Sequence, residues 1–316
     1  MKFIVTGACG FIGSYVSKEL LEQGHAVKGV DCFVDYYDRR IKELHLSSLQ
    51  QYRGFSFLEK DVNNLNREDL ADVEVIVHQA AQAGVRSSWG DNFEVYTHHN
   101  VLATQKLLEL AAQLPLKRFV YASSSSVYGK VDKLPLEESD LPQPISPYGV
   151  SKLAAEHLCN LYYTNFGVPV VSLRYFTVYG PGQRPDMAFH LFFRALLKDE
   201  DIQIYGDGKQ TRDFTYIDDI VKANINAANE PDLEGKVFNI AGGHRISLLE
   251  AVRTMETITG KKAKIKYLES QKGDPRDTYA DTTLAQKYLS YKPATRLEDG
   301  LSRQAAYMEK LIDMGL

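Results

Sequence analysis

Three glycines at intervals of three residues occur near the start of the chain, between a short apolar run and a longer helical pattern. The run Phe3-Ile4-Val5 precedes Gly7, Gly10 and Gly13, and apolar side chains recur at helical spacing over 11–23. Glycines at such a junction allow a tight turn and the close approach of a pyrophosphate. The start of the helix adds free N–H groups and the positive end of a dipole. The pattern therefore predicts a strand, a phosphate-binding loop and a helix.

Apolar runs of strand length alternate with longer amphipathic stretches through the first half of the chain. The expected elements are strands at 26–30, 55–58, 73–78, 118–122 and 168–173, and long helices at 96–113 and 148–166. Short buried runs separated by helices are typical of parallel strands joined by crossover helices. We therefore expect an α/β fold, a Rossmann-type doubly wound parallel sheet covered on both faces.

After residue 174 the pattern loosens, because Gly180-Pro181-Gly182 and Arg184-Pro185 interrupt it. The expected elements there are a helix at 188–197, a strand at 202–205, a turn at 206–208 and a final helix at 297–312. These elements predict a smaller C-terminal α/β lobe that binds the substrate. A ligand is then expected in the crevice between the two parts.

The division that we expect places the dinucleotide-binding domain at 1–174 and 212–240. The substrate-binding domain then comprises 175–211 and 241–316. At 316 residues the chain is long enough for two such domains, and its core needs no disulfide or structural metal.

Charge and cysteine content exclude several classes of partner. With 37 Lys+Arg against 41 Asp+Glu the net charge is −4, so we expect no nucleic-acid partner. No apolar run approaches the roughly 20 residues of a membrane span, and the N-terminus lacks a signal-peptide core. Cys9, Cys32 and Cys159 do not cluster, which indicates a reducing compartment and predicts a cytoplasmic location. The pair His98-His99 lacks a partner at ligand spacing, so we expect no metal site.

Asp31 follows the second expected strand, eighteen residues beyond Gly13. An acidic residue at this place accepts a hydrogen bond from the ribose 2′-hydroxyl of NAD and repels the 2′-phosphate of NADP. The sequence therefore predicts NAD as the cofactor. A solvated carboxylate at the end of a strand is the structural alternative for Asp31.

Tyr148 and Lys152 lie four residues apart in an expected helix, so their side chains share one face. A phenol has a pKa of about 10, too high for a base at neutral pH. An ammonium neighbour and a cationic nicotinamide ring favour the phenolate and lower that pKa. The pair therefore suits proton transfer to and from a hydroxyl whose carbon undergoes hydride transfer. The chain has 19 tyrosines, so a chance pair at this spacing is the alternative.

The spacing Gly-x-x-Gly-x-x-Gly resembles that of the short-chain dehydrogenase/reductase superfamily, in its extended, sugar-nucleotide branch. A serine run, Ser123 to Ser126, follows an expected strand and precedes the helix of Tyr148. This order resembles the Ser/Thr, Tyr and Lys catalytic set of the superfamily. The resemblance implies that Tyr148 and Lys152 are catalytic and that Ser124 donates a hydrogen bond to the substrate oxygen.

Several longer segments resemble UDP-sugar epimerases, namely 80–89, 174–181, 184–188 and 206–213. The run Arg-Pro-Asp-Met-Ala at 184–188 makes UDP-glucuronate 4-epimerases the closest resemblance. Related 4,6-dehydratases carry Thr-Asp-Glu, and related UDP-glucuronate decarboxylases resemble Thr-Ser-Glu, where this chain has Ser124-Ser125-Ser126. Epimerisation does not need those carboxylates.

The resemblance also implies which residues contact each ligand. Cofactor contacts are expected from Gly7, Gly10, Phe11, Ile12, Gly13, Asp31, Asp61, Val62, Gln79, Ala80, Ala81, Asn100, Ser123, Tyr148, Lys152 and Tyr175. Substrate contacts are expected from Arg86, Ser124, Ser125, Ser126, Tyr148, Thr177, Arg184, Tyr205, Arg212 and Arg276.

Arginine presents a planar fork that binds a carboxylate through two parallel hydrogen bonds. By resemblance, Arg184 and Thr177 hold the glucuronate carboxyl, and the alternative for Arg184 is a surface side chain after a turn. Arg212, with Arg276 as a second candidate, is expected at the diphosphate, and Tyr205 at the uracil.

These expectations imply NAD-dependent epimerisation at C4 of a UDP-sugar, UDP-glucuronate to UDP-galacturonate, through a transient 4-keto intermediate with Tyr148 as acid and base. The alternatives are a UDP-glucose or UDP-N-acetylglucosamine 4-epimerase, then a UDP-glucuronate decarboxylase. A regulator that senses NAD(H) without chemistry is the non-enzymatic alternative. One long helix carries an apolar face at Leu107, Leu108, Leu110 and Ala111. By resemblance this face and the Tyr148 helix form the four-helix bundle of a homodimer, and the alternative is a simple core face.

Overall fold

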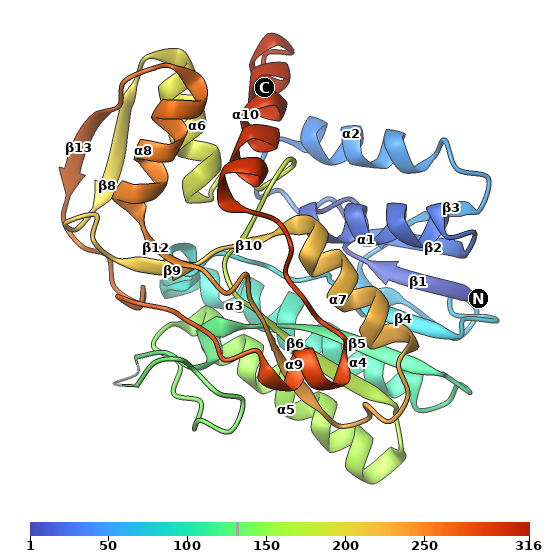
Figure 1. Cartoon of the computed structure of the whole chain (residues 1–316). Coiled ribbons are helices and arrows are strands. Elements are labelled where there is room, and N and C mark those ends of the chain that lie inside the picture. Colours follow the sequence, from blue (N-terminus) through green and yellow to red (C-terminus); the bar gives the residue numbers. More distant parts are fainter. Residues whose placement is uncertain (131–132) are drawn as a thin grey trace.

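The computed structural model describes residues 1–130 and 133–316. Its centre is a seven-stranded sheet in the order β11-β6-β5-β4-β1-β2-β3 (Figure 1). The strands are β1 (Lys2–Thr6), β2 (Ala26–Asp31), β3 (Phe55–Glu59), β4 (Val75–His78), β5 (Arg118–Ser124), β6 (Val170–Tyr175) and β11 (Val237–Ile240). All neighbouring pairs are parallel. The predicted Rossmann-type α/β fold is confirmed.

Alternate side chains of the sheet enter two different apolar cores, as the pleat of a strand requires. In β1, Phe3 and Val5 belong to one core and Ile4 to the other. Helices cover each face, so the central strands β4, β5 and β6 are buried on both sides, whereas the edge strand β3 is partly exposed. The strand order reverses between β1 and β4, which creates a crevice at the carboxyl ends of these strands.

Helices form a layer on each face of the sheet (Figure 1). On one face lie α1 (Phe11–Glu22), α2 (Arg39–Leu49) and α7 (Ile217–Asn229). On the other face lie α3 (Phe93–Tyr96), α4 (Ala103–Ala111) and α5 (Pro147–Phe166). Among the helices of the described residues, none has the length and apolar character needed to cross a membrane.

The helix expected at 96–113 is not continuous, because a π-helical turn at Thr97–Leu102 separates α3 from α4. The buried side chain of Asn100 in this turn accepts a hydrogen bond from the N–H of Gln82 (2.7 Å) and donates one to its carbonyl (3.0 Å). Thr104 donates to the carbonyl of Asn100 at 2.6 Å. These bonds fasten the wide turn to the segment that follows β4.

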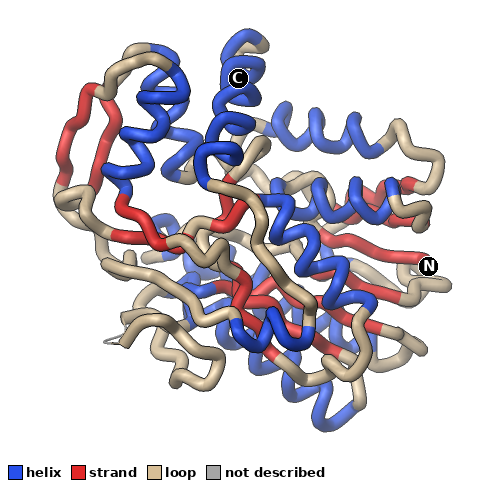
Figure 2. Tube along the Cα trace, viewed as in Figure 1, coloured by secondary structure: helices blue, strands red, loops and turns tan. Residues whose placement is uncertain are grey.

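The C-terminal part contains short two-stranded sheets and four helices, of which α6, α8 and α10 pack together. Its elements are β7 (Val178–Tyr179), α6 (Ala188–Lys198), β8 (Asp201–Tyr205), β9 (Thr211–Asp213), β10 (Thr215–Tyr216), β12 (Arg245–Ser247), α8 (Leu248–Thr259), β13 (Lys264–Leu268), α9 (Thr283–Tyr288) and α10 (Leu297–Asp313). Figure 2 shows the loops that connect β13, α9 and α10 running past the sheet. Phe193 of α6 and Met255 of α8 share one apolar core with Val5 of the sheet. The expected domain boundaries stay a prediction.

The packing of the glycine loop predicts opposite tolerances at two neighbouring positions. A Cβ atom at Gly13 would lie 2.1 Å from the carbonyl oxygen of Gly7, whereas one at Gly10 would lie 3.1 Å from the same atom. Alanine normally stabilises a helix interior by about 1 kcal/mol relative to glycine. We expect Gly13→Ala instead to lower the free energy of unfolding by about 2 kcal/mol, because overpacking displaces the loop. Urea unfolding with Gly10→Ala as the matched control measures this, and equal stabilities would contradict it.

Candidate active site

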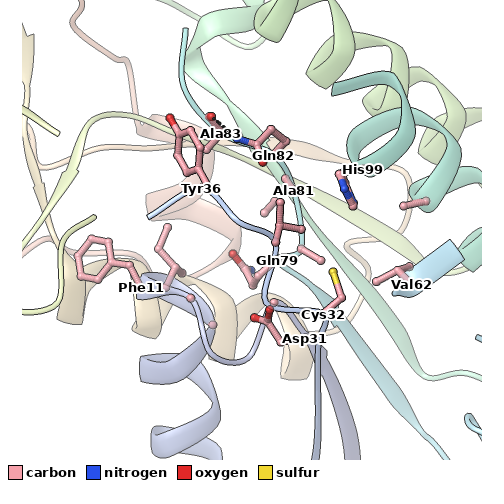
Figure 3. A pocket seen from close by; sticks show the side chains of 18 of the residues that line it. Phe11, Asp31, Cys32, Tyr36, Val62, Gln79, Ala81, Gln82, Ala83 and His99 are labelled. Atoms are coloured by element: carbon pink, nitrogen blue, oxygen red, sulfur yellow. Dashed lines mark hydrogen bonds between the residues drawn. The ribbon is translucent and has the colours of Figure 1, made fainter. Parts of the chain in front are cut away.

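A first cavity lies at the carboxyl ends of β1, β2 and β4 (Figure 3). Its wall contains the three glycines of the loop, the end of β2 and the segment that follows β4. Gly7 has φ +70°, and a Cβ there would lie 2.8 Å from the amide nitrogen of Ala80. Only glycine therefore allows the loop to lie against that segment.

Asp31 is the last residue of β2 and lines this cavity, although it is 8% exposed. Its carboxylate accepts hydrogen bonds from the N–H groups of Cys9 (3.1 Å) and Phe33 (2.9 Å). Lys42 lies 3.5 Å from the same carboxylate. Asp31 is thus a fixed acceptor beside the glycine loop rather than a freely solvated strand end, and each oxygen keeps capacity for a further donor.

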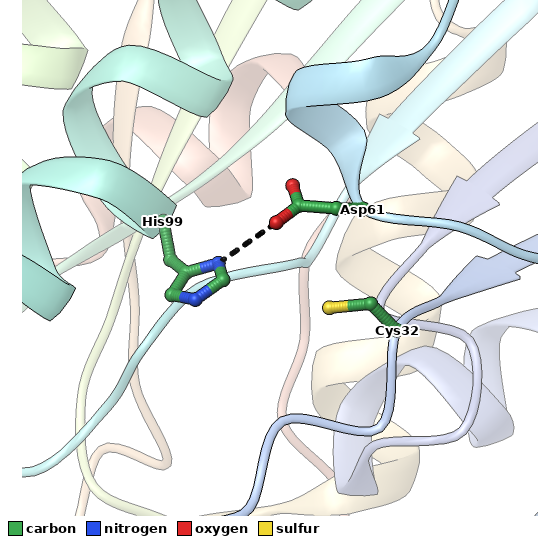
Figure 4. A group of neighbouring side chains, drawn as sticks. All are labelled: Cys32, Asp61 and His99. Carbon is green, nitrogen blue, oxygen red and sulfur yellow. Dashed lines mark ion pairs between the residues drawn. The ribbon is translucent and has the colours of Figure 1, made fainter.

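At another part of the cavity wall, Cys32, Asp61 and His99 lie together (Figure 4). Their donor atoms are within 4.8 Å of one another. Asp61 already accepts hydrogen bonds from Asn63 and, at 3.1 Å, from His98. Those bonds hold the pKa of Asp61 below its ordinary value despite partial burial. The carboxylate stays ionised at neutral pH and is positioned at the cavity surface.

The residues present fit a dinucleotide. No side chain caps the first turn of α1 within the described chain, so its N–H groups remain for a phosphate. The cavity brings together all but one of the residues expected at the cofactor, namely Gly7, Gly10, Phe11, Ile12, Gly13, Asp31, Asp61, Val62, Gln79, Ala80, Ala81, Ser123, Tyr148, Lys152 and Tyr175. The exception is Asn100, whose amide is engaged with the backbone of Gln82 and with Ser151 instead.

A second cavity adjoins the first and shares part of its wall. It contains most of the residues expected at the substrate, namely Arg86, Ser124, Ser125, Ser126, Tyr148, Thr177, Arg184, Tyr205 and Arg212. Tyr148 and Arg184 belong to the walls of both cavities. The junction of the two cavities is therefore where a group bound in one meets a group bound in the other.

The start of α5 fixes the place of Tyr148. Ser146 caps the helix by accepting a hydrogen bond from the N–H of Gly149 (3.1 Å), and Pro147 occupies the first turn. The side chain of Tyr148 therefore projects from the first turn of α5 to the junction of the two cavities. Burial raises the pKa of its phenol, while a hydrogen bond with Ser124 and the charge of Arg184 oppose that rise. The cation that lowers this pKa in the structure is thus Arg184, a residue that the sequence argument assigned only to the substrate.

Lys152 is one turn further along α5 and is 3% exposed. Burial lowers the pKa of its ammonium to about 8, although the charge of Glu156 acts in the opposite direction. The ammonium lies 4.6 Å from the centre of the Tyr121 ring. Glu156 itself is held by Arg174 at 2.6 Å and by Ser123 at 2.6 Å. A buried set of polar side chains therefore supports the end of β5 and α5 behind the junction.

Three other arginines expected at the substrate differ in their surroundings, and of these Arg212 and Arg276 are the two expected at the diphosphate. Arg86 pairs with Asp274 at 2.9 Å and lies over the Tyr205 ring at 4.2 Å. Burial lowers the pKa of Arg212, whose guanidinium donates to backbone carbonyls at 2.8 and 2.9 Å. Arg276 has a largely exposed side chain that pairs with Asp207 at 3.1 Å, and it does not line either cavity.

Sequence reasoning missed several residues of the cavity walls. Lys42 and Tyr36 line the first cavity, Tyr36 also lines the second, and Asp186 and Asp274 line the second. The run at 184–188 contains Asp186, but its pairing with Arg184 needs a loop geometry that the sequence does not specify. Tyr36 lies in an irregular segment after β2, where no pattern of apolar residues indicates which way a side chain points.

Comparison with known proteins connects this geometry with a family. Residues 3–241 match the family described as the NAD dependent epimerase/dehydratase family. The chain belongs to this family. The match confirms the predicted NAD cofactor and the resemblance to the extended, sugar-nucleotide branch of the short-chain dehydrogenase/reductase superfamily.

Relatives within the family cover the whole length of the chain. An uncharacterized UDP-glucose epimerase, YtcB, of Bacillus subtilis is 45% identical over 98% of this chain and 99% of the relative. A UDP-glucuronate 4-epimerase of Thermodesulfobacterium geofontis is 38% identical over 99% of this chain and 97% of the relative. The crystal structure of UDP-glucuronic acid 4-epimerase from Bacillus cereus with UDP-glucuronic acid and NAD has a TM-score of 0.96 and 43% identity, and covers 98% of this chain and 100% of that chain.

The depressed pKa of Lys152 predicts how stability depends on pH. The folded protein releases this proton at about pH 8, whereas an unperturbed lysine releases it at 10.5. Between these values the unfolded chain binds more protons, so the free energy of unfolding rises with pH. Relative to Lys152→Met, we expect the wild type to gain about 3 kcal/mol from pH 8 to 10.5, since one pKa unit is about 1.4 kcal/mol.

Denaturant unfolding of both proteins over this pH range measures the difference. Lys262→Met, which removes a lysine whose side chain is 90% exposed, controls for the loss of one positive charge. A stability difference between wild type and Lys152→Met that stays constant with pH would contradict the burial argument.

Proposed function

We propose that the protein interconverts UDP-glucuronate and UDP-galacturonate by epimerisation at C4, through a transient 4-keto sugar. The relatives that bear this name, and the solved complex with UDP-glucuronic acid and NAD, support the proposal. The observation that carries it is the position of Tyr148 and Arg184 in the walls of both cavities. An acid–base group and a carboxylate-binding group therefore face the place where cofactor and sugar meet.

In the proposed reaction, the residues of this chain bind the sugar and move one proton. NAD, when bound in the first cavity, supplies the acceptor and donor for the hydrogen that C4 loses and regains. Tyr148 takes the proton of the C4 hydroxyl and later returns it. Ser124 donates a hydrogen bond at the C4 oxygen, and Lys152 supports the phenol from the next turn of α5. Arg184 and Thr177 bind the carboxylate, and Arg86 and Arg212 bind the diphosphate.

The second cavity favours epimerisation over elimination or decarboxylation. Among the described residues, the carboxylates in its wall are Asp186 and Asp274, and each is paired with an arginine. Ser124, Ser125 and Ser126 occupy the place where a dehydratase or decarboxylase by resemblance carries an acid. A paired carboxylate is a poor proton carrier, because its charge is stabilised.

A neutral UDP-sugar is the second candidate substrate. The 45% identical relative is named a UDP-glucose epimerase. A regulator that only senses NAD(H) is disfavoured, because such a protein does not need the set Ser124, Tyr148 and Lys152 at the cavity junction.

We also propose a homodimer and a cytoplasmic location. The outer surface of α5 and of the π-helical turn carries exposed apolar side chains, which supports self-association there: Leu102, Val150, Leu161 and Phe166. All three cysteines are free thiols, which suits a reducing compartment. The predicted division into a dinucleotide-binding part and a substrate-binding part agrees with the two adjoining cavities and is retained as part of this proposal.

Replacing Tyr148 tests the acid–base assignment. We expect Tyr148→Phe to lower epimerisation of UDP-glucuronate by about 10³-fold, in the range for a general acid–base group, while NAD stays bound. Chromatography of the UDP-sugars measures turnover, and the absorbance of nucleotide released on denaturation measures bound NAD. Tyr163→Phe on the outer side of α5 is the matched control. Full activity of Tyr148→Phe would remove the residue from its role.

Replacing Arg184 tests the carboxylate contact. We expect Arg184→Ala to weaken binding of UDP-glucuronate by about 10–100-fold, since a hydrogen bond to a charged group contributes about 1.5–3 kcal/mol. Binding of UDP-glucose should change by less than about threefold, because it lacks the carboxylate that this charge would bind. Calorimetric titration of both sugars gives the two dissociation constants. An equal loss for both sugars would mean that Arg184 does not bind the carboxylate.

A further inference from the structure

The guanidinium of Arg184 uses one of its edges within the protein. Its Nε donates to Asp186 Oδ1 at 2.9 Å, and its Nη2 donates to Asp186 Oδ2 at 3.0 Å. Arginine has five N–H donors in a fixed plane, so this pairing occupies the Nε–Nη2 edge only. The Nη1 atom makes no hydrogen bond to any residue of the described chain, so the Nη1–Nη2 edge remains for a second carboxylate.

Asp186 is itself held from the other side. The hydroxyl of Tyr36 donates to Asp186 Oδ2 at 3.1 Å and lies 3.4 Å from the hydroxyl of Ser87. The hydroxyl of Ser87 in turn lies 2.7 Å from that of Tyr96, whose single proton is directed at the carbonyls of Ala83 and Gly84. Because Tyr36 donates to Asp186 and Tyr96 to a carbonyl, the one proton of Ser87 bonds one of the two phenol oxygens at a time. The three hydroxyls therefore form a polar cluster between Asp186 and the backbone that follows β4. The carboxylate is thus fixed on a loop that would otherwise have only Arg184 to hold it.

Both members of the pair face the sugar cavity without being fully covered. Arg184 and Asp186 line the second cavity, and their side chains are 24% and 33% exposed. Arg184 lies near enough to Tyr148 to act on its phenol. If the guanidinium rotated about the bonds of its side chain, its free edge would no longer keep one direction in the second cavity. Asp186 removes that freedom, because two parallel hydrogen bonds fix the plane of the fork.

We propose that Asp186 is a specificity-determining positioning residue, which orients Arg184 so that its free Nη1–Nη2 edge binds the carboxylate of a uronate sugar. This inference rests on the proposed function and adds a residue that acts through Arg184 without itself touching the sugar. Tyr36 contributes to the same positioning, because its hydroxyl donates to Asp186 and holds this carboxylate in the orientation that the ion pair requires. The site therefore selects uronates because the two N–H donors of Arg184 are fixed in direction, and not only because Arg184 carries a positive charge.

The conservative variant Asp186→Asn separates orientation from charge. Its amide oxygen can still accept from Tyr36 and from Nη2, but its NH2 group then faces the Nε–H donor of Arg184. The variant therefore loses one of the two parallel bonds and removes one negative charge near the fork. If Asp186 were only a counter-charge, this removal would strengthen binding of a uronate. If Asp186 orients the fork, binding of a uronate weakens.

The experiment measures dissociation constants of UDP-glucuronate and UDP-glucose by calorimetry with the NAD-loaded protein. We expect Asp186→Asn to weaken UDP-glucuronate about tenfold and UDP-glucose less than twofold, and Tyr36→Phe to act in the same sense but less strongly. Asp199→Asn removes one carboxylate from an exposed ion pair with Lys264 and is the matched control. Thermal unfolding checks that each variant is folded.

A double-mutant cycle completes the test. In an Arg184→Ala background, Asp186→Asn should leave the ratio of the two dissociation constants unchanged, because the group it positions is gone. The inference is overturned if the single variant Asp186→Asn strengthens binding of UDP-glucuronate or weakens both sugars by the same factor. It is also overturned if Asp186→Asn changes the ratio of the two dissociation constants by the same factor without Arg184. Wild-type conversion of UDP-glucuronate is measured separately, so a failure of the proposed function is distinguishable from a failure of this inference.

Discussion

The site depends on the surroundings of two side chains of α5: Tyr148, half-buried at the junction of the two cavities, and Lys152, buried one turn behind it. Burial raises the pKa of the phenol and lowers that of the ammonium, so both groups are driven towards their neutral forms. An ionised phenol at this place therefore needs compensation by neighbouring groups. Ser124 and Arg184 provide it within the protein. The capped start of α5 brings the phenol to this position.

Two arginines in the wall of the second cavity are each paired with a carboxylate. Arg86 pairs with Asp274, and Arg184 pairs with Asp186, so neither guanidinium stands alone in the cavity wall. An isolated buried cation costs free energy, and a carboxylate partner offsets that cost. The partner also fixes the plane of the fork. In the proposed function, a diphosphate or carboxylate then adds hydrogen bonds to a group whose direction is already set.

Local patterns were sufficient to predict the parts of the structure that depend on neighbouring residues. The glycine loop, the strand pattern and the pair Tyr148 and Lys152 follow from spacing in one segment, and the predicted sheet is confirmed. The π-helical turn around Asn100 was not predictable, because its cause is a pair of bonds to Gln82, eighteen residues away. Pairings such as Arg86 with Asp274 join residues 188 positions apart. Such contacts depend on the tertiary fold, and the periodicity of apolar residues within one segment does not predict them.

The continuous apolar core has a consequence for how a sugar changes its face. Phe193 and Met255 of the C-terminal part pack in the same core as Val5 of the sheet. Separation of the C-terminal part from the sheet would expose apolar surface on both, and the free-energy cost grows with the area exposed. A ring that turns over must then do so inside walls that stay in place. The same fixed cavity must therefore fit the sugar ring in two orientations, one for each epimer. A bulky group on the ring must fit the cavity wall in both orientations.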